Sequence, residues 1–464
     1  MAETDIVCIS PVDGSEFARR ALISTEGLAA VLDRARAAQR IWARTPLVER
    51  HAAMARFLEA LSAANDEIVP ELAWQMGRPV RYGGELRGLK ERITHSIALA
   101  SSALEPVRPM DFSADRPRYV KRLPLGIVLV VAPWNYPYLT ATNAIVPALL
   151  AGNAVILKHA SQTILAGERL AAAMAVAGLP DGLFANVVLS HSQTNALIGS
   201  GQIDHVNFTG SVQGGQAIAA ATGNTFTSLG LELGGKDPAY VRADAALAPT
   251  VAALVDGSFY NSGQCCCGIE RIYVAREIYS DFVEAFVAET KNYALGNPLD
   301  SGTTLGPMAN RRVASIVRTQ TAAAIAAGAR ALIDEKLFAA SAAGTPYLAP
   351  QVLVDVNHSM DVMSEESFGP VVGIMPVESD AAAVAMMNDS QYGLTASIWT
   401  NDLEAAERLG DEIDTGTLFV NRCDYVDPGL AWTGIKNSGR GASLSRVGFE
   451  TLTRPKSFHI AKLA

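Results

Sequence analysis

Cysteine is scarce in this chain, with five residues among 464, and three of the five stand side by side as Cys265, Cys266 and Cys267. Adjacent cysteines do not pair easily with one another, and the sequence contains no CxxC or HExxH motif typical of a metal site. Because successive side chains point in different directions, we expect the three thiols not to converge on one ion. The sequence therefore predicts free thiols, no metal and a reducing, cytoplasmic compartment.

Excess positive charge and an uninterrupted apolar run are also lacking, and we expect no signal peptide. The formal net charge is −9 with no long basic run, which argues against a nucleic-acid partner. The first ten residues begin acidic and lack the basic and apolar regions of a signal peptide. Residues 123–157 carry no charge, but four prolines interrupt them, at Pro124, Pro133, Pro137 and Pro147. Since an interior proline removes a helical hydrogen bond that lipid cannot replace, this stretch predicts buried strands and a core helix, not a membrane span.

What the sequence does contain is an alternation of short apolar runs and helical segments. Its length predicts two to three domains, and 49% hydrophobic with 18% charged residues suits a packed globular protein. The first hundred residues have helical spacing, as in residues 24–45. Beyond them we expect strands at residues 126–132, 154–158, 183–189, 204–210 and 269–274, helices at 164–178 and 280–294, and a helix from an N-cap at Asp244 to Ser258. This alternation predicts an α/β fold with doubly wound parallel sheets, which bind ligands beyond the carboxyl ends of their strands.

Two loops offer groups suited to ligands, although each also has an ordinary explanation. Gly210, Ser211 and Gly215 follow an expected strand and open an expected helix, where free amide groups suit a pyrophosphate. A simple strand-to-helix turn uses the same residue types. Asn135, held between two prolines, could donate its amide to an oxyanion or serve only as a turn residue. The residues alone leave both alternatives open.

A carboxylate and the cysteine triplet are candidates for acid–base and nucleophilic chemistry. Glu232 stands between two leucines and before two glycines, where burial would raise its pKa toward that of a useful base. The more common state of a glutamate is a solvated or salt-bridged one. A nucleophilic cysteine needs an accessible thiolate beside an acid–base partner. Nothing in the triplet selects one sulfur, and all three could be small buried residues.

Taken together and in order, these motifs resemble the NAD(P)-dependent aldehyde dehydrogenase superfamily. The resemblance runs from about residue 10 to the C-terminus and rests on PWNYP (133–137), ELGGK (232–236), NSGQCCC (261–267) and EESFGPV (365–371). It implies two doubly wound, Rossmann-like domains and a small β oligomerisation arm. The NAD(P)-binding domain would comprise residues 1–105 and 125–233, the catalytic domain 234–447, and the arm 106–124 and 448–464. The resemblance further implies a homodimer or homotetramer built by this arm.

In this resemblance Cys266, the second residue after the GQ pair, is the nucleophile. Its thiolate would attack the aldehyde carbonyl, Asn135 and the backbone N–H of Cys266 would hold the oxyanion, and hydride loss to NAD(P)+ would leave a thioester. Glu232 would activate the water that hydrolyses the thioester to the carboxylic acid. Two alternatives are an acylating enzyme that passes the thioester to coenzyme A, whose known members generally lack this glutamate, and an inactive binding protein of the same fold.

The cofactor is expected to be NAD or NADP. The resemblance assigns to its site Trp134, Lys158, Ser161, Gly210, Ser211, Gly215, Glu366 and Phe368. Lys158 would reach the adenosine ribose, the turn at Ser211 the pyrophosphate, and Glu366 the nicotinamide ribose. Ser161 stands where NAD-preferring relatives often have a glutamate that repels a 2′-phosphate, so NADP is permitted.

The resemblance also implies a substrate pocket, lined by Tyr136, Thr140, Asn143, Cys265, Cys267, Arg422, Tyr425 and Trp432. Its aromatic side chains suit an apolar or aromatic aldehyde. Arg422 could instead face the carboxylate of a semialdehyde, or form only a surface salt bridge. The sequence thus predicts a small-molecule aldehyde as the substrate and leaves an aromatic or aliphatic aldehyde and a semialdehyde as alternatives.

Overall fold

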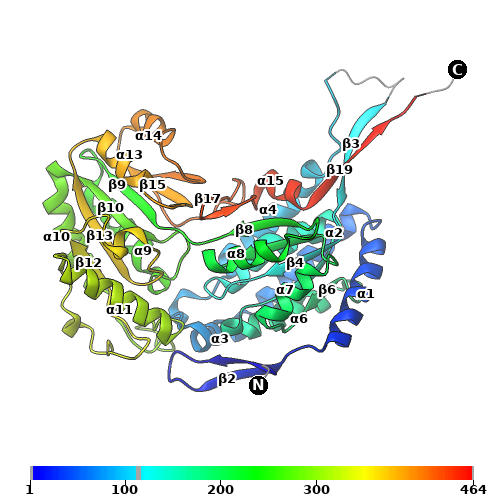
Figure 1. The fold of residues 1–464 in the computed structure, drawn as a ribbon, viewed down its shortest axis with the longest axis horizontal. Helices are drawn as coiled ribbons and strands as arrows, with labels where there is room; N and C mark the ends of the chain where they lie inside the picture. Colours follow the sequence, from blue (N-terminus) through cyan, green and yellow to red (C-terminus); the bar gives the residue numbers. More distant parts are fainter. Residues whose placement is uncertain (1–3, 111–116, 462–464) are drawn as a thin grey trace.

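Two mainly parallel sheets, each packed against helices, form the framework of the chain (Figure 1). The computed structural model describes residues 4–110 and 117–461. Residues 1–3, 111–116 and 462–464 belong to the ranges predicted for the NAD(P)-binding domain and the arm, and they lie outside the described residues. The predicted α/β class with doubly wound sheets is confirmed by the order and direction of the strands.

The first sheet combines strands from the first half of the chain with one late strand. Its members, in spatial order, are β18 (Gly439–Arg440), β8 (Ser228–Glu232), β7 (His205–Thr209), β4 (Ile127–Val131), β5 (Ala154–Lys158) and β6 (Phe184–Asn186). Neighbours are parallel except β18, which runs antiparallel to β8. β4 and β5 are buried along their whole length, which is why β4, and β5 as far as Leu157, appear in the sequence as continuous apolar runs.

Helices from the first half of the chain and one late helix share a hydrophobic core with this sheet. They are α1 (Thr25–Trp42), α2 (Leu47–Ala63), α3 (Asn65–Met76), α4 (Leu86–Ala103), α5 (Pro137–Ala151), α6 (Ile164–Val176), α7 (His191–Gly199), α8 (Val212–Ala221) and α15 (Ser445–Thr451). The predicted helices at 24–45 and 164–178 correspond to α1 and α6. Ser24 begins α1 by accepting the Gly27 N–H at 3.0 Å, an N-cap that satisfies a free donor of the first turn.

The second sheet is built from the second half of the chain. Its order is β11 (Arg330–Ala331), β12 (Gln351–Val354), β13 (Val371–Val377), β10 (Ile269–Ala275), β9 (Asp237–Val241), β15 (Thr395–Trp399) and β16 (Thr417–Val420). All pairs are parallel except the edge strand β11. The accompanying helices are α9 (Leu247–Phe259), α10 (Tyr279–Thr290), α11 (Arg311–Ala326), α12 (Asp361–Ser364), α13 (Asp380–Asn388) and α14 (Leu403–Gly410).

Asp244 does not cap α9, contrary to the sequence prediction. The helix begins at Leu247 with Ala246 in the cap position. The Asp244 carboxylate instead accepts the Thr400 hydroxyl at 2.7 Å and the Asn401 backbone N–H at 2.9 Å. These partners are more than 150 positions away in the chain, so local sequence gave no sign of them.

A two-stranded antiparallel arm projects from the body beside α15 (Figure 1). In it, β3 (Arg118–Pro124) pairs with β19 (Thr453–His459), and the stacked rings of Tyr119 and Phe458 lie with centroids 5.0 Å apart. Smaller pairings join β1 (Asp5–Ile9) to β2 (Glu16–Ala21) and β14 (Tyr392–Gly393) to β17 (Ile435–Lys436). Among the described residues, none of the helices has the length and apolar character that a membrane span requires.

Candidate active site

The cysteine triplet lies in a turn that leads from α9 into β10. Before it, Asn261 and Ser262 have φ angles of 53° and 59°, a backbone conformation that few non-glycine residues adopt. The Asn261 amide donates to the carbonyl of Asn135 at 3.2 Å, and the Ser262 hydroxyl donates to the carbonyl of Gly306 at 2.8 Å. Contacts to two other segments thus hold the strained backbone and set the direction in which the triplet enters β10.

The three sulfur atoms converge, contrary to the sequence prediction. The Gly268 N–H donates to the Cys265 carbonyl at 3.2 Å, so the triplet forms a tight turn and not an extended strand. Side chains in such a turn no longer alternate, and the Sγ atoms of all three cysteines lie within 4.8 Å of one another. Cys265 and Cys267 are buried with their Sγ atoms 3.5 Å apart, while Cys266 is partly exposed. Within the triplet, Cys266 is therefore the sulfur most open to a substrate.

The two flanking thiols share a carboxylate. Asp424, in the loop after β16, accepts at a single oxygen, Oδ1, from the Cys265 thiol at 2.9 Å and the Cys267 thiol at 3.1 Å. Each thiol has one proton, so it donates either to Asp424 or to a thiolate at Cys266. These neighbouring donors lower the pKa of Cys266 to about 6, against the opposing effect of burial. Since the thiolate is the nucleophilic form, Cys266 combines access with reactivity.

Asn135 lies beside the triplet, in the loop between β4 and α5. It is 4% exposed, and its Nδ2 donates to the carbonyl of Gln264, two residues before Cys266, at 3.2 Å. Its own carbonyl accepts from the buried guanidinium of Arg78. Arg78 pairs with Glu85 at 2.8 Å, and Glu85 also accepts the first free N–H groups of α5. A buried ion pair that sequence reasoning missed thus fixes the loop carrying the amide.

Glu232 ends β8, at the carboxyl edge of the first sheet. The Thr209 hydroxyl lies 3.5 Å from its Oε2, and burial raises the pKa of Glu232 above its ordinary value. The chain then passes so close to the triplet that a β-carbon on Gly235 would lie 2.7 Å from the carbonyl oxygen of Cys266. Only glycine fits at this approach, which brings the carboxylate segment against the nucleophile segment.

The same glycine pair also contacts Glu366. A β-carbon on Gly234 would lie 2.3 Å from both carboxylate oxygens of Glu366, and the Gly235 N–H donates to Oε1 at 3.1 Å. Burial raises the pKa of Glu366 to about 8. The structure therefore brings Glu366 to the ELGGK segment, as a residue near the reactive part of a cofactor would require.

A second buried ion pair supports this segment, and sequence reasoning missed it too. The Lys236 Nζ lies 2.5 Å from Glu270 Oε2 and donates to the Ser367 hydroxyl at 3.0 Å. Glu270 also accepts the backbone N–H groups of Ser367 and Phe368, each at 2.9 Å. The loop that carries Glu366 is thus fastened to β9 and β10 by charge-assisted hydrogen bonds.

Two aromatic residues predicted for the cofactor come together from different sheets. The rings of Trp134, after β4, and Phe368, before β13, lie with centroids 5.5 Å apart at 82°. This edge-to-face arrangement is a favourable geometry for an aromatic pair. The site therefore joins residues that stand more than 230 positions apart in the chain.

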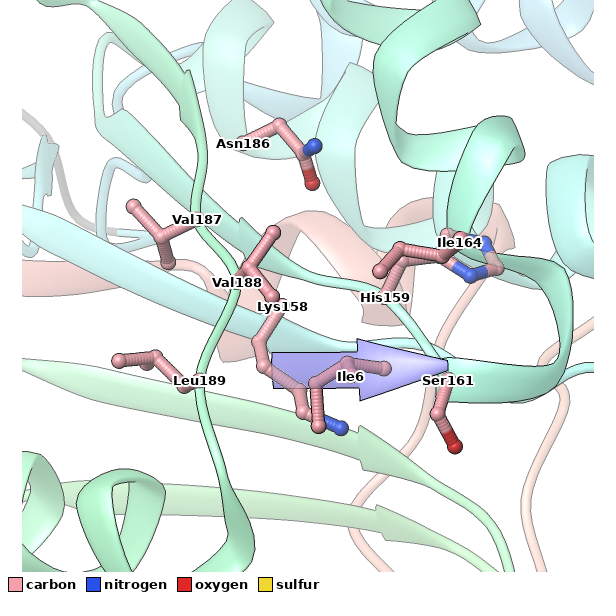
Figure 2. A pocket seen from close by; sticks show the side chains of 9 residues that line it. All are labelled: Ile6, Lys158, His159, Ser161, Ile164, Asn186, Val187, Val188 and Leu189. Carbon is pink, nitrogen blue, oxygen red and sulfur yellow. The ribbon is translucent and has the colours of Figure 1, made fainter. Parts of the chain in front are cut away.

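Lys158 and Ser161 line one pocket at the carboxyl end of β5. Figure 2 shows this pocket, with the side chains of Lys158 and Ser161 projecting toward the same side. The other lining residues are Ile6, His159, Ile164, Asn186, Val187, Val188 and Leu189. An amine and a hydroxyl at the end of a parallel strand are suitable donors for a sugar or phosphate oxygen.

The glycine turn before α8 has a packing explanation. Ser211 is the N-cap of α8, accepting the Gly214 N–H at 3.1 Å. A β-carbon at Gly210 would lie 2.7 Å from the Phe208 ring, and one at Gly215 would lie 2.6 Å from Leu233. The structure thus accounts for these glycines by close packing, and it also leaves the positive end of α8 at the carboxyl edge of the sheet.

The residues predicted for the substrate side divide into two groups. Tyr136 and Trp432 share a cluster with the triplet, together with Leu394, Leu444 and Val426. Thr140 donates its hydroxyl to the carbonyl of Tyr136 at 2.7 Å.

Arg422 belongs to the second group, which lies at the surface. Arg422 is exposed, and its guanidinium carbon lies 3.4 Å from the centroid of the Tyr425 ring. The Tyr425 hydroxyl donates to Glu91 on α4. Stacking on Tyr425 is thus the contact that the structure gives to Arg422, the arginine predicted to face a carboxylate.

Arg92 on α4 is a cation that sequence reasoning did not single out. Its Nη1 donates to the Asn143 amide oxygen at 3.1 Å, which uses one of its five N–H donors. Burial lowers the pKa of Arg92, and its charge acts on Glu232, Cys266 and Cys267. A charged residue on an amphipathic helix has the same sequence signature whether it faces solvent or an active site, so local sequence gave no signal.

Comparison with known proteins agrees with this geometry. Residues 1–458 match the model of the aldehyde dehydrogenase family. The chain is 34% identical to a phenylacetaldehyde dehydrogenase of Pseudomonas fluorescens over 90% of its own length and 85% of the relative. It is 31% identical to a succinate-semialdehyde dehydrogenase, NADP(+), of Deinococcus radiodurans over 98% and 94%. A crystal structure of succinic semialdehyde dehydrogenase from Streptococcus pyogenes in complex with NADP+ matches with a TM-score of 0.93 and 27% identity over 98% of this chain and 100% of that one. The chain therefore belongs to the aldehyde dehydrogenase family and is an NAD(P)-dependent oxidoreductase of aldehydes.

Proposed function

We propose that the chain oxidises its aldehyde through a thioester on Cys266, that Asn135 supports the oxyanion and that Glu232 activates the hydrolytic water. One observation carries this assignment: a partly exposed sulfur of lowered pKa lies with an amide donor on one side and the segment of a carboxylate of raised pKa on the other. Nucleophile, oxyanion donor and base are the three groups that acyl transfer through a thioester needs.

The proposed reaction uses the thiolate first. The Cys266 sulfur bonds to the carbonyl carbon, and the oxygen takes the electron pair and becomes an oxyanion held by the Asn135 amide and the backbone N–H of Cys266. Bound NAD(P)+ supplies the hydride acceptor for the oxidation that follows. Glu232 then takes a proton from water, the water oxygen attacks the thioester carbon, and the acid leaves as Cys266 returns to its thiolate.

The cofactor would lie along the carboxyl edge of the first sheet. Lys158 and Ser161 at β5 would contact the adenosine end, and Ser211 with the first turn of α8 the pyrophosphate. Glu366 would contact the nicotinamide ribose, since it lies against the glycines next to the nucleophile. The remaining predicted contacts are Trp134, Phe368, Gly210 and Gly215. Ser161 carries no charge that would repel a 2′-phosphate, so we propose that NADP is accepted as well as NAD.

We further propose that the substrate carries a carboxylate remote from the aldehyde, and that Arg92 binds it. Arg92 is partly buried and its charge acts on Cys266, whereas Arg422 is exposed and stacked on Tyr425. A guanidinium in a partly desolvated site, with N–H donors beyond the one given to Asn143, binds a carboxylate by charge-assisted hydrogen bonds. The similarity to succinate-semialdehyde dehydrogenases is consistent with such a substrate. Tyr136, Thr140 and Trp432 would line the apolar part of the path.

We also propose the division of the chain given by the sequence. The NAD(P)-binding domain would comprise 1–105 and 125–233, the catalytic domain 234–447, and the arm 106–124 and 448–464. The arm supports a homodimer or homotetramer: β3 is bridged to Val107 through Val120, but among the described residues β19 pairs with β3 alone, so its other edge is open to a second copy. A cytoplasmic location is proposed from the free thiols of all five cysteines, which a reducing compartment preserves.

Substitution of each cysteine of the triplet tests the assignment of the nucleophile. We expect Cys266→Ala to lower aldehyde oxidation by at least about 10³-fold. Cys265→Ala and Cys267→Ala should keep most of the activity, with the pH profile moved upward because a donor to the Cys266 thiolate is lost. Similar losses in all three variants would refute a single nucleophile.

Coenzyme A should not accelerate NAD(P)H formation, since Glu232 is present to activate water, and a large acceleration would support the acylating alternative.

A further inference from the structure

We infer that the cysteine triplet and Asp424 form a binding site for a single thiophilic divalent cation, with Zn²⁺ as the best match. Three sulfur atoms lie within 4.8 Å of one another, and a carboxylate oxygen of Asp424 contacts two of them, those of Cys265 and Cys267. Thiolate and carboxylate are both ordinary ligands of Zn²⁺, and four such ligands complete a tetrahedral shell.

The spacing of the ligand atoms suits this ion. A tetrahedral site with Zn–S bonds of about 2.3 Å places its sulfurs about 3.8 Å apart. In the structure, the Cys265 and Cys267 sulfurs are 3.5 Å apart and all three lie within 4.8 Å of one another. Asp424 Oδ1 is 2.9 Å and 3.1 Å from the two flanking sulfurs. The spacings of these atoms are thus within about 1 Å of the tetrahedral value, and the proposed site forms from them by side-chain rotation.

Ion binding at this point replaces protons and needs no oxidant. The Cys265 and Cys267 thiols now direct hydrogen atoms at the same carboxylate oxygen, and a cation would take the place of both protons, which pass to water. The three thiolates and the carboxylate carry four negative charges, so a bound dication leaves a net charge of −2. The charge of Arg92 acts on Cys266 and Cys267 and offsets part of this excess.

The surroundings allow entry and then exclude water. Cys266 is partly exposed and gives an ion access, while Cys265 and Cys267 are buried. Trp432 and Leu394 are also buried and pack against the triplet. A dry apolar shell strengthens the attraction between an ion and its thiolates and limits hydrolysis of the bonds.

The consequence for catalysis rests on the proposed role of Cys266. A sulfur that is coordinated to Zn²⁺ no longer offers a free electron pair to an aldehyde, so the occupied enzyme would be inactive until the ion leaves. Binding of the ion, in contrast, depends on the ligand geometry alone. The two parts are therefore measured separately.

Zinc titration of the full-length protein tests the inference. We expect one Zn²⁺ to remain per chain after desalting, and Cd²⁺ in its place to give the ultraviolet charge-transfer absorbance of several thiolate ligands. Cys265→Ser, Cys267→Ser and Asp424→Asn should each raise the dissociation constant at least about tenfold, since loss of a ligand costs no less than loss of a supporting contact. Cys8→Ser is the matched control, because Cys8 is a buried cysteine in β1 outside the triplet, and it should bind Zn²⁺ as the unaltered protein does.

Inhibition is followed as loss of NAD(P)H formation, with each variant compared with its own zinc-free rate. We expect the loss to follow occupancy and to be reversed by a chelator. Three results would overturn the site. They are absence of stoichiometric binding, a Zn²⁺ affinity of the Cys265→Ser and Asp424→Asn variants equal to that of the unaltered protein, and reversal of the inhibition by a phosphine reductant but not by a chelator. Stoichiometric binding with full activity would leave the site standing and contradict Cys266 as the nucleophile.

Discussion

Replacement of Glu232 by glutamine should separate the two halves of the reaction. The substitution keeps the shape of the side chain and an oxygen that can accept the Thr209 hydroxyl, but it removes the proton acceptor. General base catalysis contributes about 10²–10⁴-fold to a rate, so we expect steady turnover to fall by that range. The attack by Cys266 needs no help from Glu232, so the first NAD(P)H should still form quickly, at about one per active site in a burst.

The pH dependence of turnover tests the same role of Glu232. Only the ionised carboxylate takes a proton, and burial raises the pKa of Glu232, so turnover of the unaltered enzyme should rise as the pH rises through that elevated value. The Glu232→Gln variant should lose this limb.

Stopped-flow measurement of NAD(P)H absorbance reports the burst and the steady rate together. Glu59→Gln, an exposed glutamate on α2, is the matched control and should change neither quantity. A variant that lost the burst but kept fast turnover would contradict the hydrolytic role of Glu232. Unchanged turnover with an unchanged pH profile would contradict it as well.

Four further predictions concern specificity, stability and reactivity. Arg92→Met should lower kcat/KM for an ω-carboxylated aldehyde by about 10–100-fold, because one charged hydrogen bond is lost. It should affect an uncharged aldehyde of equal length much less, and equal losses would refute the role of Arg92 in binding the carboxylate. Lys236→Met should lower the free energy of unfolding by about 3–5 kcal/mol in urea titrations, because it leaves the buried Glu270 without its charged partner. Adding Glu270→Gln to this variant should restore part of the loss, and no recovery would contradict the pairing. Ser161→Glu should lower kcat/KM for NADP more than for NAD, and an unchanged ratio would mean that another residue reads the 2′ position. Alkylation of Cys266 by iodoacetamide should accelerate as the pH rises through about 6, and a midpoint near the ordinary value of a thiol would contradict the effect of its neighbours.

Most of the sheet framework was predictable because parallel strands are buried on both faces. The runs at 126–132 and 154–157 are apolar and became β4 and most of β5, which ends at Lys158; both strands are buried. The prediction that Asp244 caps α9 was wrong because its partners are distant in the sequence. A short carboxylate can accept hydrogen bonds from many different donors. In the folded chain Asp244 accepts them from Thr400 and Asn401 and not from the first turn of α9.

The meeting of three segments at the candidate site was predictable from their motifs. PWNYP, ELGGK and NSGQCCC placed Asn135, Glu232 and Cys266, and the structure brings these segments into contact. The supporting charges were not predictable. Arg78 and Lys236 are fully buried in ion pairs, yet single charged residues of this kind usually indicate a solvated surface.

The expected divergence of the three thiols failed because it assumed an extended chain. The hydrogen bond from Gly268 to Cys265 closes a turn, and the alternation of side chains holds only in strands. The same turn that exposes Cys266 therefore gathers its neighbours around it.

The most direct test of the account is to identify the atom that carries the acyl group. The Glu232→Gln variant, mixed with aldehyde and NAD(P)+ and quenched in acid, should accumulate a thioester because its hydrolysis is slow. Peptide mass spectrometry should then find the acyl group on Cys266, removable by hydroxylamine. An acyl group on Cys265 or Cys267, or rapid turnover with no covalent adduct on any cysteine, would contradict the account.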